Sequence, residues 1–282
     1  MSKFVSILGI VLITVSFSFS AVAGSEVGVV STRTSTGNVV NSAVGKNNKA
    51  KTSIGGVSVS NSKIGVVSTR TRTGNVVNSA VGKNNQAETL IGSTSVSNSK
   101  VGVVSTDTQT GNVVNSAVGK NNQAKTLIGN TAIKNSKVGV VSTRTKTGNV
   151  VNSAVGKNNK AQTLIGNAVV SNSKVGVVST DTQTGNVVNS AVGKGNVANT
   201  SIGNAYISNS KVGVVSTDTR TGNVVNSAVG KGNRANINIG NIHVTGSKAG
   251  VISTQTRTGN VINSAVGKGN TADTNIGSVN IK

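Results

Sequence analysis

The chain has 282 residues, a formal net charge of +22, and no proline, cysteine or tryptophan. It holds one tyrosine, and its three phenylalanines all lie within the first twenty residues, so the remainder lacks the large side chains that fill a conventional globular core. The absence of cysteine excludes a fold held together by disulfides. The abundant valine favours strands, so we expect stability to come from backbone ladders and a thin core.

The first 23 residues have the pattern of a secretory signal peptide. Lys3 precedes a short apolar run from Val5 to Val15, and the segment ends with Ala-Val-Ala at residues 21–23. The run is too short to span a membrane, which takes about 20 residues. We expect cleavage after Ala23 and a secreted mature chain, residues 24–282, with no transmembrane segment and a net charge of +21 once Lys3 is lost.

One segment, Thr-Gly-Asn-Val-Val-Asn-Ser-Ala-Val-Gly-Lys, recurs every 37 residues without an insertion. An unbroken period is typical of a repeat architecture, whereas a disordered linker needs no register. We expect residues 24–282 to form seven tandem 37-residue β repeats. The segment begins at Thr36, Thr73, Thr110, Thr147, Thr184, Thr221 and Thr258, and the last copy has Ile262 for the second valine.

Each repeat contains two related halves. In the repeat from Gly111 to Thr147, both halves open with Gly-Asn and both carry Asn-Ser-x-Val-Gly, at residues 115–119 and 135–139. This similarity predicts two rungs per repeat, and a single coil per repeat is the alternative. The predicted fold is all-β: a repetitive β-solenoid, or cross-β stack, of strand–turn–strand rungs joined at Gly and Asn corners.

Comparison of the repeats with one another indicates which side chains face solvent. Between the threonines of Thr-x-Thr-x-Thr the residues vary among Arg, Asp, Gln and Lys, so they are expected to point outward. Alternation along a strand then places Thr106, Thr108 and Thr110 inward. By the same test, positions 123, 125 and 127 face outward and their neighbours face inward.

Stacked repeats would place each inward side chain above its own copy, and asparagine amides would hydrogen-bond along the stack as in cross-β structures. The lysine of the Gly-Lys turn should reach water in every repeat. The predicted stacking residues of one repeat are Asn112, Asn115, Ala117, Gly119, Asn122, Ala124, Thr126 and Ile128. The predicted basic surface consists of Lys46, Lys83, Lys120, Lys157, Lys194, Lys231 and Lys268.

The stretch from Val114 to Ala124 resembles the V-N-x-A-x-G-x-x-N-x-Q repeat core of Fap-type bacterial fibre subunits, except that Gln123 directly follows the second asparagine. Residues 119–124 also resemble the G-x-x-N-x-A core of curlin repeats, although Ala117 and Ile128 stand where curlin has glutamines. The resemblance covers the first half of all seven repeats. It implies an exported functional amyloid whose subunits stack into curli-like fibres of a biofilm matrix.

Neither a catalytic site nor a metal site is predicted. The single histidine, His243, occupies a variable outward position. Three of the six acidic residues share the Thr-Asp-Thr position, but Arg or Gln replaces them in other repeats, so no paired carboxylates or calcium ladder is built. The Gly-Lys pairs lack the spacing of a phosphate-binding loop. We expect no enzyme activity and no cofactor.

The sequence predicts a secreted structural subunit that self-assembles, through strand edges that no proline interrupts, into extracellular amyloid-like fibres for adhesion or aggregation at the cell surface. Its expected partners are copies of itself, outer-membrane secretion and nucleation proteins, and polyanions such as extracellular DNA or acidic polysaccharide. One alternative is a monomeric secreted β-solenoid adhesin that binds acidic polymers. Another is an ice-binding protein, which would need the Thr-x-Thr-x-Thr arrays to face water.

Overall fold

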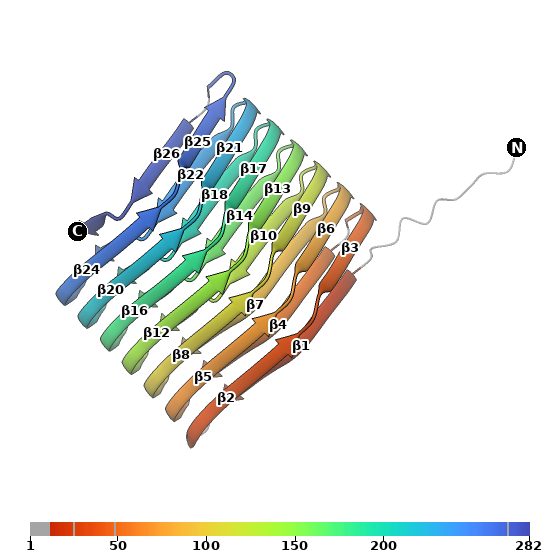
Figure 1. The fold of residues 1–282 in the computed structure, drawn as a ribbon. Coiled ribbons are helices and arrows are strands. Elements are labelled where there is room, and N and C mark those ends of the chain that lie inside the picture. Colours follow the sequence, from red (N-terminus) through yellow and green to blue (C-terminus); the bar gives the residue numbers. More distant parts are fainter. Residues whose placement is uncertain (1–11, 25, 48, 270) are drawn as a thin grey trace, which may run out of the picture.

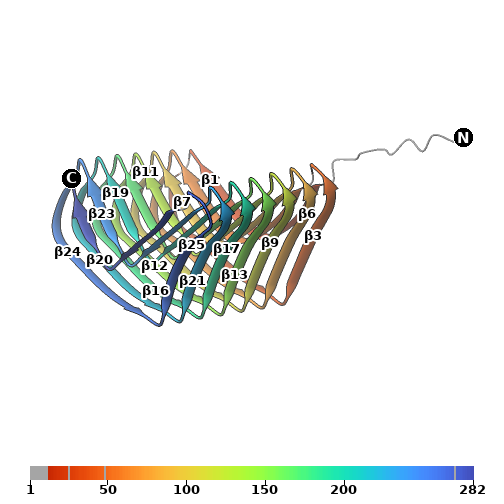
Figure 2. The ribbon, with the colours of Figure 1, turned by 90° about the horizontal axis from the view of Figure 1, so that it is seen from above.

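The computed structural model describes residues 12–24, 26–47, 49–269 and 271–282, and the regular elements in these ranges are all β-strands. They form a β-solenoid of about seven turns, which confirms the predicted fold class. Figure 1 shows the turns side by side in sequence order, with the first and last turns at opposite ends of the stack. Figure 2 shows that equivalent strands of successive turns lie next to one another, so that each side of the coil is a parallel sheet.

Three parallel sheets make up the sides of the coil, and each turn visits sheet B, then sheet C, then sheet A. Sheet B contains β2 (Glu26–Thr36), β5 (Lys63–Thr73), β8 (Lys100–Thr110), β12 (Lys137–Thr147), β16 (Lys174–Thr184), β20 (Lys211–Thr221) and β24 (Lys248–Thr258). Sheet C contains β3 (Val39–Lys46), β6 (Val76–Lys83), β9 (Val113–Lys120), β13 (Val150–Lys157), β17 (Val187–Lys194), β21 (Val224–Lys231) and β25 (Val261–Val266). Sheet A contains β1 (Leu12–Ala23), β4 (Lys49–Ser60), β7 (Gln86–Ser97), β10 (Gln123–Ile128), β11 (Thr131–Lys134), β14 (Lys160–Ile165), β15 (Ala168–Ser171), β18 (Val197–Ile202), β19 (Ala205–Ser208), β22 (Arg234–Ile239), β23 (Ile242–Thr245), β26 (Thr271–Ile276) and β27 (Val279–Ile281).

Each strand pairs with the strand one full repeat away. Asn115 of β9 lies opposite Asn152 of β13, and Thr126 of β10 lies opposite Thr163 of β14. One 37-residue repeat therefore makes one turn, which corrects the prediction of two rungs per repeat. The two halves are similar in sequence, but the 11-residue strands of sheet B and the 8-residue strands of sheet C find an identical partner only in the next repeat. At about 4.8 Å per rung, seven turns make a stack about 30 Å long.

The corners of each turn are made by residues with left-handed backbone. In one turn, φ is 128° at Gly119, 58° at Asn121, 61° at Gly129 and 50° at Asn135. Glycine adopts such angles freely and asparagine more readily than other residues, which explains the Gly and Asn at these points of the repeat. The corner of Asn121 is taken by glycine in the later turns, at Gly195, Gly232 and Gly269, again with positive φ.

The interior holds two narrow apolar clusters, and neither contains an aromatic side chain. One lies between sheets B and A and includes Val104 and Ile133; the other lies between sheets C and A and includes Val113 and Ile128. Every turn contributes the same small side chains, so stacking builds continuous columns that exclude water. This is the thin core that the composition predicts.

The threonines of Thr-x-Thr-x-Thr point into the interior, as their constancy among the repeats predicts. Thr106 and Thr108 are buried, and Asp107 between them faces outward. The Oγ1 atom of Thr106 donates a hydrogen bond to Oγ1 of Thr94 at 2.8 Å, and Oγ1 of Thr108 donates to the carbonyl oxygen of Gly92 at 3.2 Å. Because these threonines do not face water, the geometry that ice binding by this array would require is not present.

The predicted signal peptide, residues 1–23, lies partly outside the described residues. Its part from Leu12 to Ala23 forms β1, which pairs in parallel with β4 and so covers one edge of sheet A. Cleavage after Ala23 stays a prediction; it would remove β1 and leave β4 at that edge. Within the described ranges, no helix has the length and apolarity needed to cross a membrane.

Candidate assembly and binding surfaces

A ladder of buried asparagine side chains runs along the interior of the stack. The Nδ2 atom of Asn115 donates to Oδ1 of Asn152 at 3.1 Å, and the same bond joins Asn152 to Asn189 and Asn189 to Asn226, each at 2.9 Å. The first four members of this ladder have no solvent exposure. Each of these Nδ2 atoms donates to the copy of its own residue in the next turn, while Oδ1 of Asn115, at the start of the bonded run, has no hydrogen-bond partner among the described residues. The ladder therefore depends on exact parallel registration of the turns.

A second asparagine column closes the Gly-Lys corner. The backbone N–H of Asn122 donates to Oδ1 of Asn159 at 2.7 Å, while Nδ2 of Asn122 donates to the carbonyl oxygens of Gly82 at 2.9 Å and Val118 at 2.6 Å. The side chain of Asn122 thus satisfies backbone groups of its own turn and of the preceding turn. Buried backbone groups at a corner need such partners, which gives this asparagine a structural reason to recur.

The other predicted stacking residues differ in where they lie. Ala117, Ala124, Thr126 and Ile128 are buried and lie opposite their own copies in the adjacent turns. Asn112 is exposed rather than inward, and its Oδ1 accepts a hydrogen bond from the backbone N–H of Asn149 at 2.9 Å. Gly119 lines the corner itself, where its positive φ brings the chain close to the preceding turn.

The strand edges of the last turn are uncovered in the part of the chain that the structure describes. Strands β24, β25, β26 and β27 each pair with a preceding turn, and no described strand pairs with their other edge. Side chains that are interior elsewhere consequently meet solvent: Ile239 has no exposure, whereas its counterpart in the last turn, Ile276, is 40% exposed. An edge of this kind presents unpaired N–H and C=O groups that can receive another strand.

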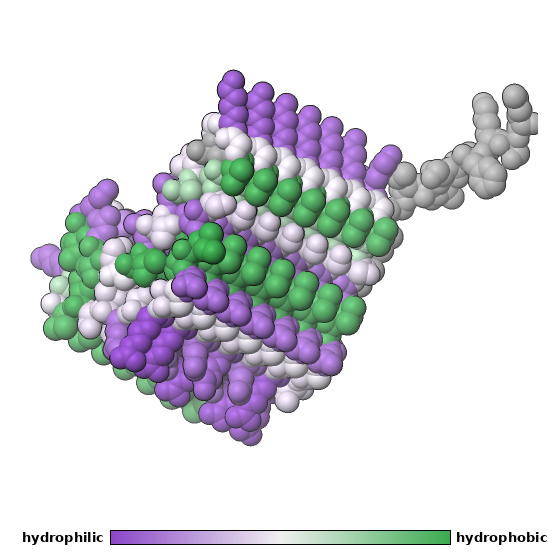
Figure 3. Space-filling view, turned by 45° about the horizontal axis from the view of Figure 1, so that its top comes forward, coloured by the Kyte–Doolittle hydropathy of each residue, from purple (hydrophilic) through white to green (hydrophobic). Residues whose placement is uncertain are grey.

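The outer face of sheet C carries two valine stripes that run the length of the stack, visible as two green bands in Figure 3. The inward positions of its strands are Asn115 and Ala117, so alternation turns the valines on either side outward. Even within the stack, Val118 is 37% exposed. A continuous apolar face of this kind is typical of contact with another protein surface. We define the valine face as Val40, Val44, Val77, Val81, Val114, Val118, Val151, Val155, Val188, Val192, Val225, Val229, Ile262 and Val266.

The lysines of the predicted basic surface form one row along the Gly-Lys corner. All seven are exposed, and adjacent members such as Lys120 and Lys157 lie opposite each other in neighbouring strands. Figure 3 shows a purple comb of hydrophilic side chains along one edge of the valine face, where this corner lies. We call these seven residues the corner lysine row.

A second lysine row, which the sequence reasoning missed, lines a groove along the start of sheet B. The groove has a volume of about 1170 Å³, and each turn contributes a Lys-Val-Gly segment or a close variant of it to the lining. The glycines after the first turn leave no room for a side chain; a Cβ on Gly102, for example, would lie 2.5 Å from the carbonyl oxygen of Gly65. The sequence signal that could have revealed this row is a lysine two residues before a glycine, which recurs at the same position in six of the seven repeats. The groove lysine row consists of Lys63, Lys100, Lys137, Lys174, Lys211 and Lys248.

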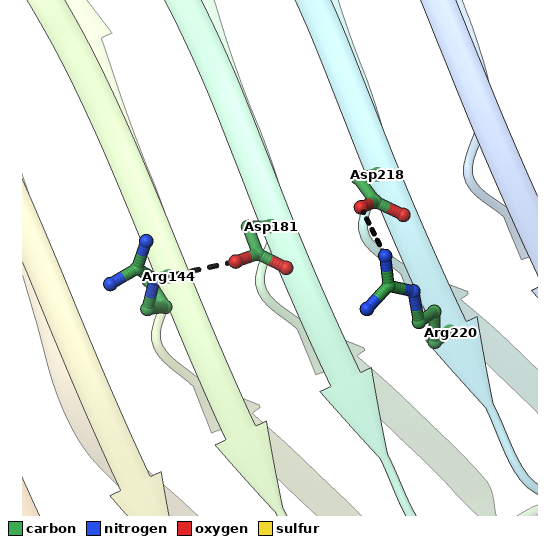
Figure 4. Close-up of polar contacts among 4 residues, drawn as sticks. All are labelled: Arg144, Asp181, Asp218 and Arg220. Atoms are coloured by element: carbon green, nitrogen blue, oxygen red, sulfur yellow. Dashed lines mark hydrogen bonds and ion pairs between the residues drawn. The ribbon is translucent and has the colours of Figure 1, made fainter.

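Ion pairs lie on the outer face of sheet B, some between turns and one within a single strand. Nε of Arg144 lies 3.3 Å from Oδ2 of Asp181, and Nη2 of Arg220 lies 3.1 Å from Oδ2 of Asp218, as Figure 4 shows. These side chains are partly exposed, and pairs of this type stabilise a fold by about 0–1 kcal/mol each. These pairs change the charge pattern of the outer surface and contribute little to the stability of the stack.

The described residues contain no group of three or more His, Cys, Asp or Glu side chains that could hold a metal ion. His243 makes a contact of 3.1 Å between its Nε2 atom and Oγ1 of Thr245 in the same strand. Burial raises the pKa of the hydroxyl of Tyr206, which also hydrogen-bonds to Ser201. Tyr206 and His243 lie opposite each other in strands β19 and β23 and line one small pocket on the outer face of sheet A.

Comparison of the chain with protein-family models, with curated proteins and with solved structures finds no match.

Proposed function

We propose that this protein is a secreted structural subunit that stacks end to end into extracellular amyloid-like fibres, for adhesion or aggregation in a biofilm matrix or at a cell surface. The observation that carries the proposal is the uncovered edge of strands β24 to β27, which ends a run of turns with almost identical side chains. A further copy placed there would extend every backbone and asparagine ladder by the same contacts that hold the turns together.

Two other features support the proposal. The chain contains no proline, which is one device that proteins use to block an exposed strand edge. The valine face would give such stacks a dry lateral contact, like the paired sheets of a steric zipper. Secretion and nucleation by outer-membrane proteins enter the proposal only through the resemblance to Fap-type and curlin subunits.

The test is seeded growth of the chain from residue 24 to residue 282 at neutral pH, followed by X-ray fibre diffraction. We expect filaments that lengthen when fragments of earlier filaments are added, with a meridional reflection at about 4.7 Å. A solution that remains monomeric and rich in β-structure for days, with or without added seeds, would remove the basis of the fibre proposal.

The groove lysine row favours a second candidate function, a solenoid adhesin that binds an acidic polysaccharide as a monomer. Successive lysines stand one rung apart, about 4.8 Å, so an extended polymer lying in the groove would meet a positive charge at every turn. The described chain offers no row of aromatic side chains on which the bases of a single-stranded nucleic acid could stack, so a polysaccharide is the better match.

The two lysine rows provide a matched pair of variants for this candidate. One variant changes the six groove lysines to glutamine; the other changes six corner lysines, at 83, 120, 157, 194, 231 and 268, and so loses the same net charge. We expect the groove variant to lose roughly tenfold or more in affinity for polygalacturonate, with a shallower dependence on salt, because fewer counterions are released. Binding is measured by titration calorimetry at several salt concentrations.

Equal losses in the two variants would mean that binding follows net charge and that the groove is not a site. Unchanged affinity in the groove variant would also exclude it. Duplex DNA serves as a comparison ligand, and tighter binding of DNA than of polygalacturonate would argue against a polysaccharide site.

A further inference from the structure

Two acidic residues differ from the other acidic residues in lying in the end turns of the stack. Four of the six have a cationic partner between these ends: Glu88 with Lys125, Asp107 with Arg70, Asp181 with Arg144 and Asp218 with Arg220. The remaining two are Glu26, in the first turn, and Asp273, in the last turn. These two residues lie at opposite ends of the stack, so their significance appears only when the last turn of one copy is placed against the first turn of another.

Glu26 stands at the head of the groove lysine row. It occupies the position that is lysine in each of the next six turns, and its carboxylate forms an ion pair with Lys63 of the second turn. The hydrogen bond from Lys63, with the attraction of its charge, lowers the pKa of Glu26. At the other end of the row, Lys248 lies in β24, whose outer edge has no described partner strand. A copy added there in continuing register would place its Glu26 opposite Lys248.

Asp273 ends a second row, on the outer face of sheet A. In this row Lys51 lies opposite Glu88 in the strand pairing, and Asn236 lies opposite Asp273. Asp273 is exposed and forms no ion pair with a described residue. A copy added in continuing register would place its Lys51 opposite Asp273, once cleavage after Ala23 has removed β1 from the edge of β4.

We propose that these two oppositely charged pairs, Lys248 with Glu26 and Asp273 with Lys51 of the next copy, form a head-to-tail junction that sets the direction and register of stacking. The inference rests on the proposed fibre function. Interior turns are nearly identical, so their hydrogen-bond ladders alone would allow copies to stack in several registers. The charged pairs at the two ends would favour one of these registers. Opposite charges across an interface favour the correct encounter, and like charges disfavour the wrong one.

The other outward rows are compatible with this junction. Gln255 would meet Arg33 and Arg257 would meet Ser35, so neither pair brings together like charges. The corner row would bring Lys268 beside Lys46, which only repeats the lysine pairing already present between successive turns. Stacking two identical ends would instead make the strands antiparallel and would interrupt the asparagine ladders.

The experiment uses the chain from residue 24 to residue 282 with Asp273→Lys or Lys51→Glu, in seeded elongation at low salt. Either variant alone places like charges at every junction, Lys against Lys or Asp against Glu, and should elongate roughly tenfold more slowly than the unchanged chain. An equimolar mixture of the two should regain the normal rate, because alternating copies restore an opposite pair at each junction. The defect should fade at high salt.

Asn280→Lys is the control, because it adds a positive charge to the last turn at a position that would face Ser58 of the next copy. It should elongate at close to the normal rate, and circular dichroism should show all the variants folded alike. Normal elongation of each charge variant alone, or a mixture as slow as its components, would overturn the junction and leave the fibre proposal intact. Failure of the unchanged chain to elongate would overturn both.

Discussion

Gly119→Ala is expected to disrupt the coil around it and to lower the free energy of unfolding by more than about 3 kcal/mol. The residue has φ of 128°, a region that side-chain-bearing residues rarely adopt. A Cβ on it would lie 1.7 Å from the carbonyl oxygen of Gly82 in the preceding turn, closer than any packing permits. Because repeat proteins depend on contacts between adjacent units, a lesion in a central turn should weaken the whole stack.

The measurement is urea unfolding of the monomer followed by far-ultraviolet circular dichroism. Gly37→Ala is the matched control, because Gly37 has ordinary φ and no atom within 4 Å of the position that its Cβ would take. We expect that control to change stability by less than about 0.5 kcal/mol. Similar stabilities for the two variants would contradict the close approach of successive turns at the Gly-Lys corner.

Asn152→Leu is expected to destabilise the stack by about 2–5 kcal/mol, although leucine is apolar and similar in size. The side chain accepts a hydrogen bond from Asn115 and donates one to Asn189, and all three are buried. Replacing the middle member leaves the Nδ2 donor of Asn115 and the Oδ1 acceptor of Asn189 with only long hydrogen bonds of 3.4 Å, to the carbonyl oxygen of Ala87 and from Oγ1 of Thr163. The cost is that of two buried polar groups left poorly hydrogen-bonded, against which the extra apolar contact is a smaller gain.

The comparison for this variant is Asn149→Leu, three residues earlier. Asn149 also belongs to an asparagine column, since its Oδ1 accepts from the backbone N–H of Asn186, but it is exposed and water can replace that bond. Its substitution should cost less than about 1 kcal/mol. Equal losses of stability at the two positions, measured by urea unfolding, would show that burial of the ladder contributes nothing.

Much of the fold was predictable because a comparison of equivalent positions in the repeats shows which side chains vary and which are constant. Positions such as Asp107 and Arg144 vary between turns while the threonines beside them do not, and this contrast correctly assigns the faces of sheet B. The Gly and Asn corners were also predictable, since few other residues adopt their backbone angles. Local composition and alternation therefore suffice for strand faces and corners.

The number of rungs was predicted wrongly, because internal similarity and strand pairing are different properties. The Asn-Ser-x-Val-Gly motif occurs twice per repeat, yet strands of unequal length pair with their own copies one repeat away. Asn112 was expected inward with Asn115, but it lies where the corner before β9 turns its side chain outward. The groove lysine row was missed because a groove arises from the three-dimensional bend of the strands, which a repeat motif does not reveal.

The corner lysine row has a consequence that grows with the number of stacked copies. Its members stand about one rung apart, closer than the screening length of about 8 Å at physiological ionic strength. A single molecule carries only seven such charges, but a long stack would behave as a linear polyelectrolyte with a dense layer of condensed counterions. A polyanion would displace many of those counterions at once, so retention of acidic polymers would be strong for the assembled fibre and weak for the free subunit.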